Sequence, residues 1–518
     1  MLPSTPADPD LVRALEAICG ADHVSAGDAD RMAYARDMWP RSLIRQRAGA
    51  FDHPPEVVVW PGSAEEVAAV VKAAVGAGRC TVPFGAGSGV CGGTLPVRGG
   101  VVLDLKRLNR ILDLVESDCV AHVEAGAIGE ILERELNRRG WTLGHFPSSI
   151  YCSTLGGWLA GRSAGQCSSR FGKIEDMLRK LTWVDADGRL CETPFAPPGF
   201  APWSADPLIV GSEGTLGIIC SAWMVIRPLS AKRRYTAWIL PDVEAGIDCM
   251  RSVMRAGLRP SVLRLYDEFD TLVAGSDPAV DEPGSSLLGG LAEKASAPAK
   301  ALFHLGLARV LQMPRLLNRA ADLLPGGCLL VAVFEGEDWE RDLSADLLAE
   351  ICAGRDGKDQ GEGPARHWWH HRYSISYKQS PVFMDGAFVD TMEVAATWDR
   401  LPAMYRKVRQ ALAPLAFVMA HFSHAYSEGG SIYFTFAGAA SDDAAALGVY
   451  DRIWDAAQAA VSAERGVVSH HHGVGLSKAR YLVRQLGEAG SLVCAVKRAF
   501  DPHGRLNPGK LGLEEMDP

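Results

Sequence analysis

Residues 81–96 have the sequence TVPFGAGSGVCGGTLP, in which a short apolar run leads into a loop dense in glycine. Five of the nine residues from 85 to 93 are glycine: Gly85, Gly87, Gly89, Gly92 and Gly93. Glycine adopts positive φ at little cost, so such a loop can press its backbone against a ligand. Successive N–H groups that point inward bind anions, typically phosphate. The stretch therefore predicts either a nucleotide diphosphate site or a glycine-rich hairpin without chemistry.

The residues on both sides of this loop predict a β-α-β unit followed by another strand. Val57–Val59 form an apolar run, and Ser63 with Glu66 three residues later is typical of a helix N-terminus. Valines and alanines then recur at helical spacing before the apolar run at 80–84. No helical pattern and no Lys-Ser/Thr pair follow the glycines, so neither of the common helix-opening phosphate motifs is present.

Two more segments combine glycine with serine or threonine. Residues 147–178 contain Gly156, Gly157, Gly161 and Gly165, so a helix there would present a nearly bare face. A flat ligand could lie on that face, or another helix could pack tightly against it. Residues 207–229 contain a second Ser/Gly turn that leads into an apolar strand.

The totals for the chain exclude several classes of protein. With 518 residues, 47% of them hydrophobic, the chain is long enough for two or more domains. The net charge of −9 and the lack of a basic stripe argue against nucleic-acid binding. The 12 cysteines form no CxxC pair and resemble reduced, buried thiols. There is no signal peptide pattern, no apolar run of membrane-spanning length and no C-terminal peroxisomal signal, so we expect a cytoplasmic protein.

A second domain begins after residue 230, where new strand and helix patterns start. Within it, residues 303–324 form an apolar segment with Arg309, Arg315 and Arg319 spaced through it. A basic amphipathic helix of this kind can rest on a bilayer surface, although packing against its own sheet is the commoner outcome. The segment 303–324 is therefore a candidate for peripheral membrane contact, and packing against the protein's own sheet is the favoured alternative.

Titratable residues gather in the last third of the chain. His470, His471 and His472 precede Gly473, and a strand there would place the first and third histidine on one face. Histidine exchanges protons near neutral pH, as carbon-acid chemistry requires. His421 and His424 could join them as metal ligands, but adjacent histidines on a strand diverge, and we expect no metal.

Three further side chains are candidate site residues because of the apolar or aromatic sequence around them. Tyr433 alternates with apolar residues in SIYFTFAG, and Arg264 lies in the apolar run VLRLYD. A buried arginine normally has an anionic partner, either a protein carboxylate or a ligand. Lys378, among aromatic residues, has the same two interpretations.

Taken together, PFGAGSGVCGG, STLGGWLAGRSAGQCSSRFGKIEDM, GSEGTLGI and DPHGRLNPGK resemble the FAD-binding half of the vanillyl-alcohol-oxidase flavoprotein superfamily. The resemblance implies an α+β fold with a two-part, PCMH-type FAD-binding domain and an inserted α/β cap domain over the flavin. The implied divisions are an N-terminal lead at 1–50, the FAD-binding domain at 51–230, the cap at 231–460 and a returning C-terminal segment at 461–518.

The resemblance also assigns residues to FAD. Members that attach FAD covalently through the glycine loop carry a histidine in it, and this loop has none, so we expect non-covalent FAD. The implied cofactor-binding residues are Pro83, Gly85, Ala86, Gly87, Ser88, Gly89, Ser148, Ser153, Thr154, Gly156, Gly157, Ser163, Gly165, Glu213, Gly214, Gly217, Ile218 and Asn507.

Within the superfamily, PSVLRLYD, MEVAATWDR, HAYSEGGSIYFTF and SHHHGVG look most similar to the alkyl-dihydroxyacetone-phosphate synthases of ether-lipid assembly. That family exchanges the acyl group of acyl-dihydroxyacetone phosphate for a fatty alcohol through an adduct at flavin N5. The resemblance makes Tyr433 the acid/base and lets the loop of His470, His471 and His472 move the C1 proton and bind phosphate. Arg264 and Lys378 would contact the substrate, although the family has an arginine where Lys378 stands.

A FAD-dependent D-2-hydroxyacid dehydrogenase, acting on lactate, glycolate or 2-hydroxyglutarate, is the alternative. Such enzymes often carry a metal motif, of which His421 matches the first histidine. Tyr433 stands at the second histidine and His471 at the glutamate, so two of the three metal ligands are changed. Under either interpretation we expect a lipid or small-molecule substrate that carries phosphate or carboxylate, and a homodimer.

Overall fold

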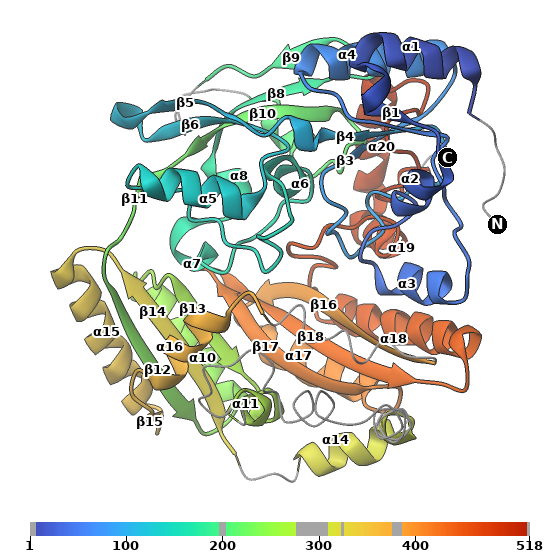
Figure 1. The fold of residues 1–518 in the computed structure, drawn as a ribbon. Helices are drawn as coiled ribbons and strands as arrows, with labels where there is room; N and C mark the ends of the chain where they lie inside the picture. Colours follow the sequence, from blue (N-terminus) through green and yellow to red (C-terminus); the bar gives the residue numbers. More distant parts are fainter. Residues whose placement is uncertain (1–6, 196–203, 276–308, 323–325, 375–385, 515–518) are drawn as a thin grey trace, which may run out of the picture. The chain divides into compact units, whose positions relative to one another are not determined.

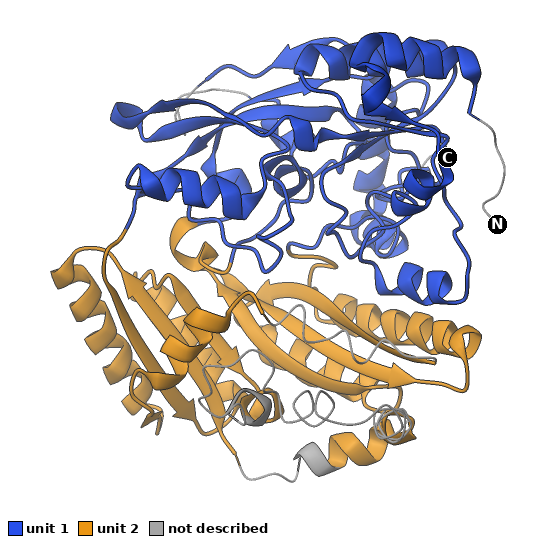
Figure 2. Ribbon diagram, viewed as in Figure 1, with its two compact units in different colours: residues 1–165, 172–229, 471–518 blue, residues 166–171, 230–470 orange. Residues whose placement is uncertain are grey.

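The chain divides into two compact units. The computed structural model describes residues 7–195, 204–275, 309–322, 326–374 and 386–514. Unit 1 comprises residues 1–165, 172–229 and 471–518, and unit 2 comprises residues 166–171 and 230–470 (Figures 1 and 2). Each unit therefore combines segments that are distant in the sequence.

Unit 1 contains two main sheets and the helices that pack on them. Its helices are α1 (Pro9–Cys19), α2 (Asp28–Ala33), α3 (Pro40–Arg47), α4 (Ala64–Gly76), α5 (Gly129–Arg138), α6 (Leu155–Ala160), α8 (Ile174–Met177), α9 (Asp206–Ile209), α19 (Ala479–Leu486) and α20 (Gly490–Phe500). Its strands are β1 (Val24–Ser25), β2 (Val57–Val59), β3 (Thr81–Phe84), β4 (Val101–Asp104), β5 (Ile111–Val115), β6 (Val120–Glu124), β7 (Trp141–Thr142), β8 (Leu178–Val184), β9 (Leu190–Glu192), β10 (Ile218–Val225) and β11 (Arg227–Pro228).

The first sheet contains the predicted β-α-β unit. Its strand order is β1-β2-β4-β3, with β2, β4 and β3 parallel. Helix α4 begins as expected, because Ser63 Oγ accepts a hydrogen bond from the Glu66 N–H at 3.2 Å. Its apolar face shares one buried core with the sheet, formed by Val57, Val59, Val67, Val70, Val71, Ala74, Val101 and Leu103 among others. The glycine-rich loop therefore starts from a rigid strand end.

The second sheet of unit 1 is antiparallel, with the strand order β5-β6-β10-β8-β9. Helix α6 packs on β6 and β10, and α4 packs on β8. The predicted Ser/Gly turn leads directly into β10, which begins at Ile218. Unit 1 thus contains two separate glycine-rich segments beside this sheet, one at α6 and one directly before β10.

Unit 2 consists of one large sheet with helices. Its helices are α7 (Ser168–Phe171), α10 (Val243–Arg255), α11 (Glu268–Gly275), α14 (Pro314–Asp322), α15 (Asp338–Ala353), α16 (Gly363–His371), α17 (Leu401–Leu412) and α18 (Asp443–Ala463). Its strands are β12 (Arg233–Leu240), β13 (Val262–Tyr266), β14 (Cys328–Glu335), β15 (Lys358–Asp359), β16 (Ala387–Thr397), β17 (Phe417–Ala425) and β18 (Gly429–Ala439).

The seven-stranded sheet of unit 2 has the order β15-β12-β14-β13-β17-β18-β16, and every pairing is antiparallel. Tyr405 of α17 contacts Phe422 and Phe434, with ring centroids 5.8 and 6.4 Å apart. Phe422 and Phe434 lie on the apolar face of the sheet, which α17 and α18 cover (Figure 1). Tyr433 alternates with Phe434 along β18, so it belongs to the opposite face. Among the described helices, none is both long and apolar enough to cross a membrane.

Residues 166–171 interrupt unit 1 and belong to unit 2, where several hydrogen bonds hold them. Gln166 Nε2 donates to the Arg372 carbonyl at 2.9 Å, and Ser169 Oγ accepts from the Ala425 N–H at 3.1 Å. Arg170 Nη1 also lies 3.3 Å from Glu340 Oε1, which forms an ion pair. The short helix α7 is therefore fixed against the strands of unit 2.

Candidate functional site

Three glycine-rich segments of unit 1 meet at the end of β3. A Cβ atom added to Gly85 would collide with Thr154 Oγ1, and one added to Gly214 would collide with the ring of Pro83. The glycine loop, the start of α6 and the turn before β10 therefore approach more closely than larger residues would allow. All 18 residues assigned to the cofactor by resemblance belong to this unit, and that assignment stays a prediction.

The glycine loop presents a row of unpaired donors. The N–H groups of Ala86, Gly87, Ser88, Gly89 and Val90 have no hydrogen-bond acceptor among the residues that the structure describes. Gly87 has φ of +62° and Gly89 is exposed. Consecutive N–H groups without a protein acceptor suit a bound pyrophosphate, which carries negative charge and several acceptor oxygens. The loop is thus suited to bind the expected dinucleotide, and a plain hairpin would not need this arrangement.

Glu213 and Asn507 tie the C-terminal segment to the glycine-rich part of unit 1. The Glu213 carboxylate accepts hydrogen bonds from the N–H groups of Val474 and Gly475, at 2.5 and 2.8 Å. Asn507 Nδ2 donates to the carbonyls of Gly93 and Glu213, at 2.9 and 2.6 Å. Asn507 Oδ1 is buried and has no partner among the described residues, so it remains able to accept a hydrogen bond from a ligand.

The glycines of α6 have two different roles. Gly156 packs against Ala125, where an added Cβ would lie 2.8 Å from the Ala125 Cβ, so close packing explains it. That contact is with the residue after β6 and not with another helix. Gly157 is exposed and leaves the bare position that a flat ligand requires. The Ser153 hydroxyl accepts a hydrogen bond from Trp158 Nε1 at 2.8 Å, so it supports the helix itself.

The polar face of the unit 2 sheet brings several predicted site residues together. Tyr433 on β18 lies directly opposite His421 on β17 and Glu393 on β16. Residues opposite one another in an antiparallel pair share a face. Tyr266 on β13 is also opposite His421, which places Arg264, two residues earlier, on the same face. Strand pairing alone therefore gathers these polar side chains.

A β-bulge adds His424 to this face. His421 and His424 are three residues apart, a spacing that places side chains on opposite faces of a regular strand. The register shifts between Phe422 and His424, so that His424 is opposite Ser431 while His421 is opposite Tyr433. The extra residue in β17 compensates for the odd spacing, and both histidines lie on the polar face.

His421 connects Arg264 to Asp270. Arg264 Nη2 lies 2.6 Å from His421 Nε2, and His421 Nδ1 lies 3.1 Å from Asp270 Oδ2. Because a guanidinium can only donate, Nε2 must accept, and the ring proton is on Nδ1, from where it is donated to Asp270. The Arg264 side chain is buried, and its Nε has no acceptor among the described residues. Arg264 can therefore still donate to an anion.

Burial sets the protonation of this cluster. Burial, together with the charge of Arg264, holds the pKa of His421 well below its usual value, so its imidazole is neutral. Burial raises the pKa of Asp270 to about 7 and that of Tyr433 to about 12. The Tyr433 hydroxyl therefore stays protonated near neutral pH, and it donates to Thr391 Oγ1 at 2.9 Å.

The triple histidine does not form the expected strand. Residues 470–472 are bends without a strand partner, and the nearest bridge joins Val467 to Ala395. The alternation that would pair His470 with His472 on one face therefore does not apply. His470 ends unit 2, where its N–H donates to Glu393 Oε1 at 3.1 Å. His471 and His472 begin unit 1, with ring centroids 4.6 Å apart. Lys378 lies outside the described residues.

Several residues that lie on this face or bind to its side chains were not identified from the sequence. Asp270, Glu393, Thr391, Tyr426 and Ser168 all contact predicted site residues. The sequence could have identified Glu393, because it is an acidic residue in the apolar run AFVDTMEVA. The structure shows that it is fully buried. A buried carboxylate needs partners, as a buried arginine does. The same argument that selected Arg264 would have selected it.

Comparison with known proteins identifies the class. The model of the FAD linked oxidases, C-terminal domain, matches residues 229–511, and a FAD binding domain model matches residues 55–194. The chain therefore belongs to the FAD-linked oxidases and is an FAD-dependent enzyme. The predicted fold class and the FAD cofactor are confirmed.

The chain is similar to several individual proteins of known name. Alkyldihydroxyacetonephosphate synthases of Trypanosoma brucei brucei and Dictyostelium discoideum are each 28% identical to this chain, over 92% and 97% of it and 75% and 80% of their own length. A solved alkyldihydroxyacetonephosphate synthase has a TM-score of 0.77 at 25% identity and covers 98% of this chain and 87% of its own. Glycolate oxidase subunit GlcD of Bacillus subtilis is 24% identical over 97% of this chain and 96% of its own length.

Proposed function

We propose that the protein exchanges the acyl group of acyl-dihydroxyacetone phosphate for a fatty alcohol, a step of ether-lipid synthesis. The relatives named alkyldihydroxyacetonephosphate synthase support this proposal over nearly the full chain. The observation that carries it is the cluster of Arg264, His421 and Asp270 beside Tyr433. It offers a buried donor for a substrate anion next to a protonated phenol.

Each group has a defined task in the proposed reaction. FAD, when bound, supplies an electron-accepting ring. Arg264 donates its Nε–H to the anionic group of the substrate and orients it. Tyr433 begins protonated, because its pKa is raised to about 12, so it acts first as an acid toward the departing oxygen. His470 accepts the C1 proton and later returns it. C1 has the same oxidation level in the acyl substrate and the alkyl product, so the exchange needs no external oxidant.

A D-2-hydroxyacid dehydrogenase is the second candidate, favoured by the similarity to the glycolate oxidase subunit. The metal motif of such enzymes would use His421. Here His421 Nε2 is 2.6 Å from the Arg264 guanidinium, so a divalent cation at that nitrogen would meet a fixed positive charge. His421 is therefore poorly suited as a metal ligand, which favours the first proposal.

An anaerobic comparison of substrates separates the two candidates. Purified holoenzyme is mixed either with palmitoyl-dihydroxyacetone phosphate and hexadecanol, or with D-lactate and D-2-hydroxyglutarate. Release of palmitate with formation of the alkyl product, without an oxidant, supports the synthase. Bleaching of the flavin by a 2-hydroxyacid, with a stoichiometric metal in the protein, would instead establish the dehydrogenase and refute our proposal.

We further propose that α14 brings unit 2 to an anionic membrane surface, where lipid substrates reside. Arg309, Arg315 and Arg319 are exposed and form no ion pair with any described residue, although the protein has a net charge of −9. Val310, Met313 and Leu316 are exposed among them. Positive charge with exposed apolar side chains suits an anionic bilayer. Residues 303–308 and 323–324 of the predicted segment lie outside the described residues.

A further inference from the structure

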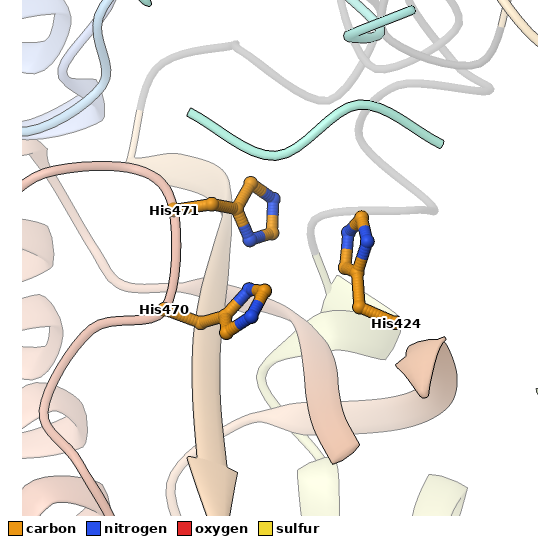
Figure 3. A group of neighbouring side chains, drawn as sticks. All are labelled: His424, His470 and His471. Atoms are coloured by element: carbon orange, nitrogen blue, oxygen red, sulfur yellow. The ribbon is translucent and has the colours of Figure 1, made fainter. Parts of the chain in front are cut away.

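Four side chains of unit 2 form a continuous chain of hydrogen bonds between two histidines. His424 Nδ1 lies 2.7 Å from Ser168 Oγ, which lies 3.2 Å from Tyr426 Oη. Tyr426 Oη in turn lies 3.1 Å from His470 Nε2. Figure 3 shows the rings of His424 and His470 side by side, with centroids 5.1 Å apart, and His471 as the next residue along the chain. The two hydroxyls thus provide a path between the imidazoles.

The positions of these residues are set by three different elements. His424 reaches the polar face because of the bulge in β17, and Ser168 opens α7. The neighbouring Ser169 hydroxyl accepts a hydrogen bond from the Ala425 N–H at 3.1 Å, which fastens α7 to the end of β17. On the other side, Glu393 Oε1 accepts from the His470 N–H at 3.1 Å and from the Ser469 hydroxyl at 2.6 Å. Both ends of the path are therefore anchored.

A count of protons gives the path two arrangements, which become comparable in charge once His470 carries an additional proton on Nδ1. Its three hydrogen bonds need three protons, and the hydroxyls of Ser168 and Tyr426 supply two of them. The third belongs either to His424 Nδ1 or to His470 Nε2. Moving one proton across each link converts one state into the other without breaking any heavy-atom contact. Once His470 Nδ1 is protonated, the positive charge can therefore lie on either histidine, because the hydroxyls carry the proton between them.

We propose that Ser168 and Tyr426 form a proton relay that carries the charge gained by His470 to His424. This inference rests on the proposed function, in which His470 removes a proton from the substrate. That proton goes to His470 Nδ1, and the proton on Nε2 passes to Tyr426 Oη. The tyrosine proton passes to Ser168 Oγ, and the serine proton passes to His424 Nδ1.

The relay leaves every intermediate group neutral. His470 ends with its proton on Nδ1, both hydroxyls are restored, and His424 becomes an imidazolium. The reverse sequence returns the proton to the substrate, so no redox partner is required. Ser168 and Tyr426 act as positioning residues, since they act on the substrate only through His470. The relay keeps the proton close while the acid leaves and the alcohol enters.

The relay is tested with variants that remove one hydroxyl each. We expect Ser168→Ala and Tyr426→Phe to lower kcat by about 10²-fold, the usual range for lost proton-transfer assistance, with KM little changed. Ser168→Thr keeps a hydroxyl and should restore most of the rate. Ser169→Ala is the matched control, because it removes the neighbouring anchor without interrupting the path. A loss in Ser169→Ala as large as in Ser168→Ala would overturn the relay in favour of a structural role.

Solvent isotope effects add a readout that packing would not change. The rate of the wild-type enzyme in mixtures of H₂O and D₂O should fall along a curve, because several protons move together. In Ser168→Ala and Tyr426→Phe the dependence should become linear. Retention of the curve in both variants would contradict the proposal.

A substrate-free measurement keeps this test separate from the proposed function. In holoenzyme with ¹⁵N-labelled histidine, His424→Gln and His470→Gln spectra assign the two rings. Ser168→Ala should shift the ¹⁵N signals of His470 as well as those of His424, whereas Ser169→Ala should leave His470 unchanged. If His470 does not respond to Ser168→Ala, the path is absent. If the path is present but wild-type enzyme performs no acyl–alkyl exchange, the proposed function alone fails.

Discussion

The imidazole of His421 is stacked on the ring of Tyr433, with centroids 4.7 Å apart and planes inclined by 15°. The pairing of β17 with β18 places the two residues directly opposite one another. Arg264 and Asp270 then fix the histidine ring from either side. A tyrosine held against a hydrogen-bonded ring has one orientation, so its hydroxyl is already positioned before substrate binds.

Tyr433→Phe tests whether that hydroxyl does chemistry. The variant keeps the ring on His421 and removes the hydroxyl that donates to Thr391, so we expect the fold and the FAD content to be preserved. Loss of a general acid should lower kcat by about 10²–10⁴-fold. The measurement is turnover together with flavin absorbance per protein. Thr391→Val is the control, since it removes the acceptor and keeps the phenol; equal losses in both variants would assign the effect to structure.

Gly89→Ala tests the phosphate-binding role of the glycine loop. An added Cβ at this exposed position meets only Asp37 Oδ2, at 3.8 Å, so the folded protein itself tolerates it. If the loop lies against the FAD pyrophosphate, the methyl group should still keep the ligand away and weaken FAD binding by about tenfold or more, which is roughly 1.4 kcal/mol. Titration of apoprotein with FAD measures this.

Gly76→Ala provides the matched control for that experiment. Gly76 ends α4, has ordinary φ, and has no atom within 4 Å of an added Cβ. It should bind FAD as wild type does. The same preparations test attachment of the cofactor: intact flavin should appear in the supernatant after acid precipitation, because the loop has no histidine to bond it. Wild-type FAD affinity in Gly89→Ala would refute the assigned contact.

The features that local sequence determines were predictable, and those set by pairing between distant strands were not. The Ser63 cap and the glycine loop after β3 depend on neighbouring residues, and both are found where the sequence placed them. The shared face of His421 and His424 depends on a bulge that no spacing rule indicates. Ser168 lies within a glycine-rich segment of unit 1 by sequence, yet it belongs to unit 2.

Asp37→Asn tests the effect of a buried carboxyl on stability. Asp37 Oδ1 accepts from the Trp39 N–H at 3.0 Å, while Oδ2 has no partner among the described residues. Burial raises the pKa of Asp37 to about 7, against about 3.9 in an unfolded chain. The native state therefore binds this proton more strongly, so the contribution of Asp37 is fully present below about pH 4 and is lost as the pH rises through 7.

As the pH rises from 4.5 to 7, the melting temperature of wild type should consequently fall relative to that of Asp37→Asn. The difference between a pKa of about 7 in the folded protein and about 3.9 in the unfolded chain sets an upper limit of roughly 4 kcal/mol on this change. Calorimetry of the holoenzymes at several pH values measures it. A difference that stays constant over this range would show that Asp37 titrates normally in the folded protein.

Leu316→Glu tests the proposed membrane contact of α14. Leu316 is 62% exposed, while the opposite side of the helix is fastened by Asn318 Nδ2, which donates to the Ala416 carbonyl at 2.9 Å. The substitution should therefore leave the fold intact and add a negative charge to a basic, apolar surface. We expect wild type to sediment with vesicles containing phosphatidylserine, and less so in high salt, while Leu316→Glu binds about tenfold more weakly. Leu343→Glu is the control, because Leu343 is 53% exposed on α15, where Arg341 is buried and paired with Asp338 and Asp342. Equal binding by wild type and both variants would exclude α14 as the contact, because membrane binding would then not depend on its apolar surface.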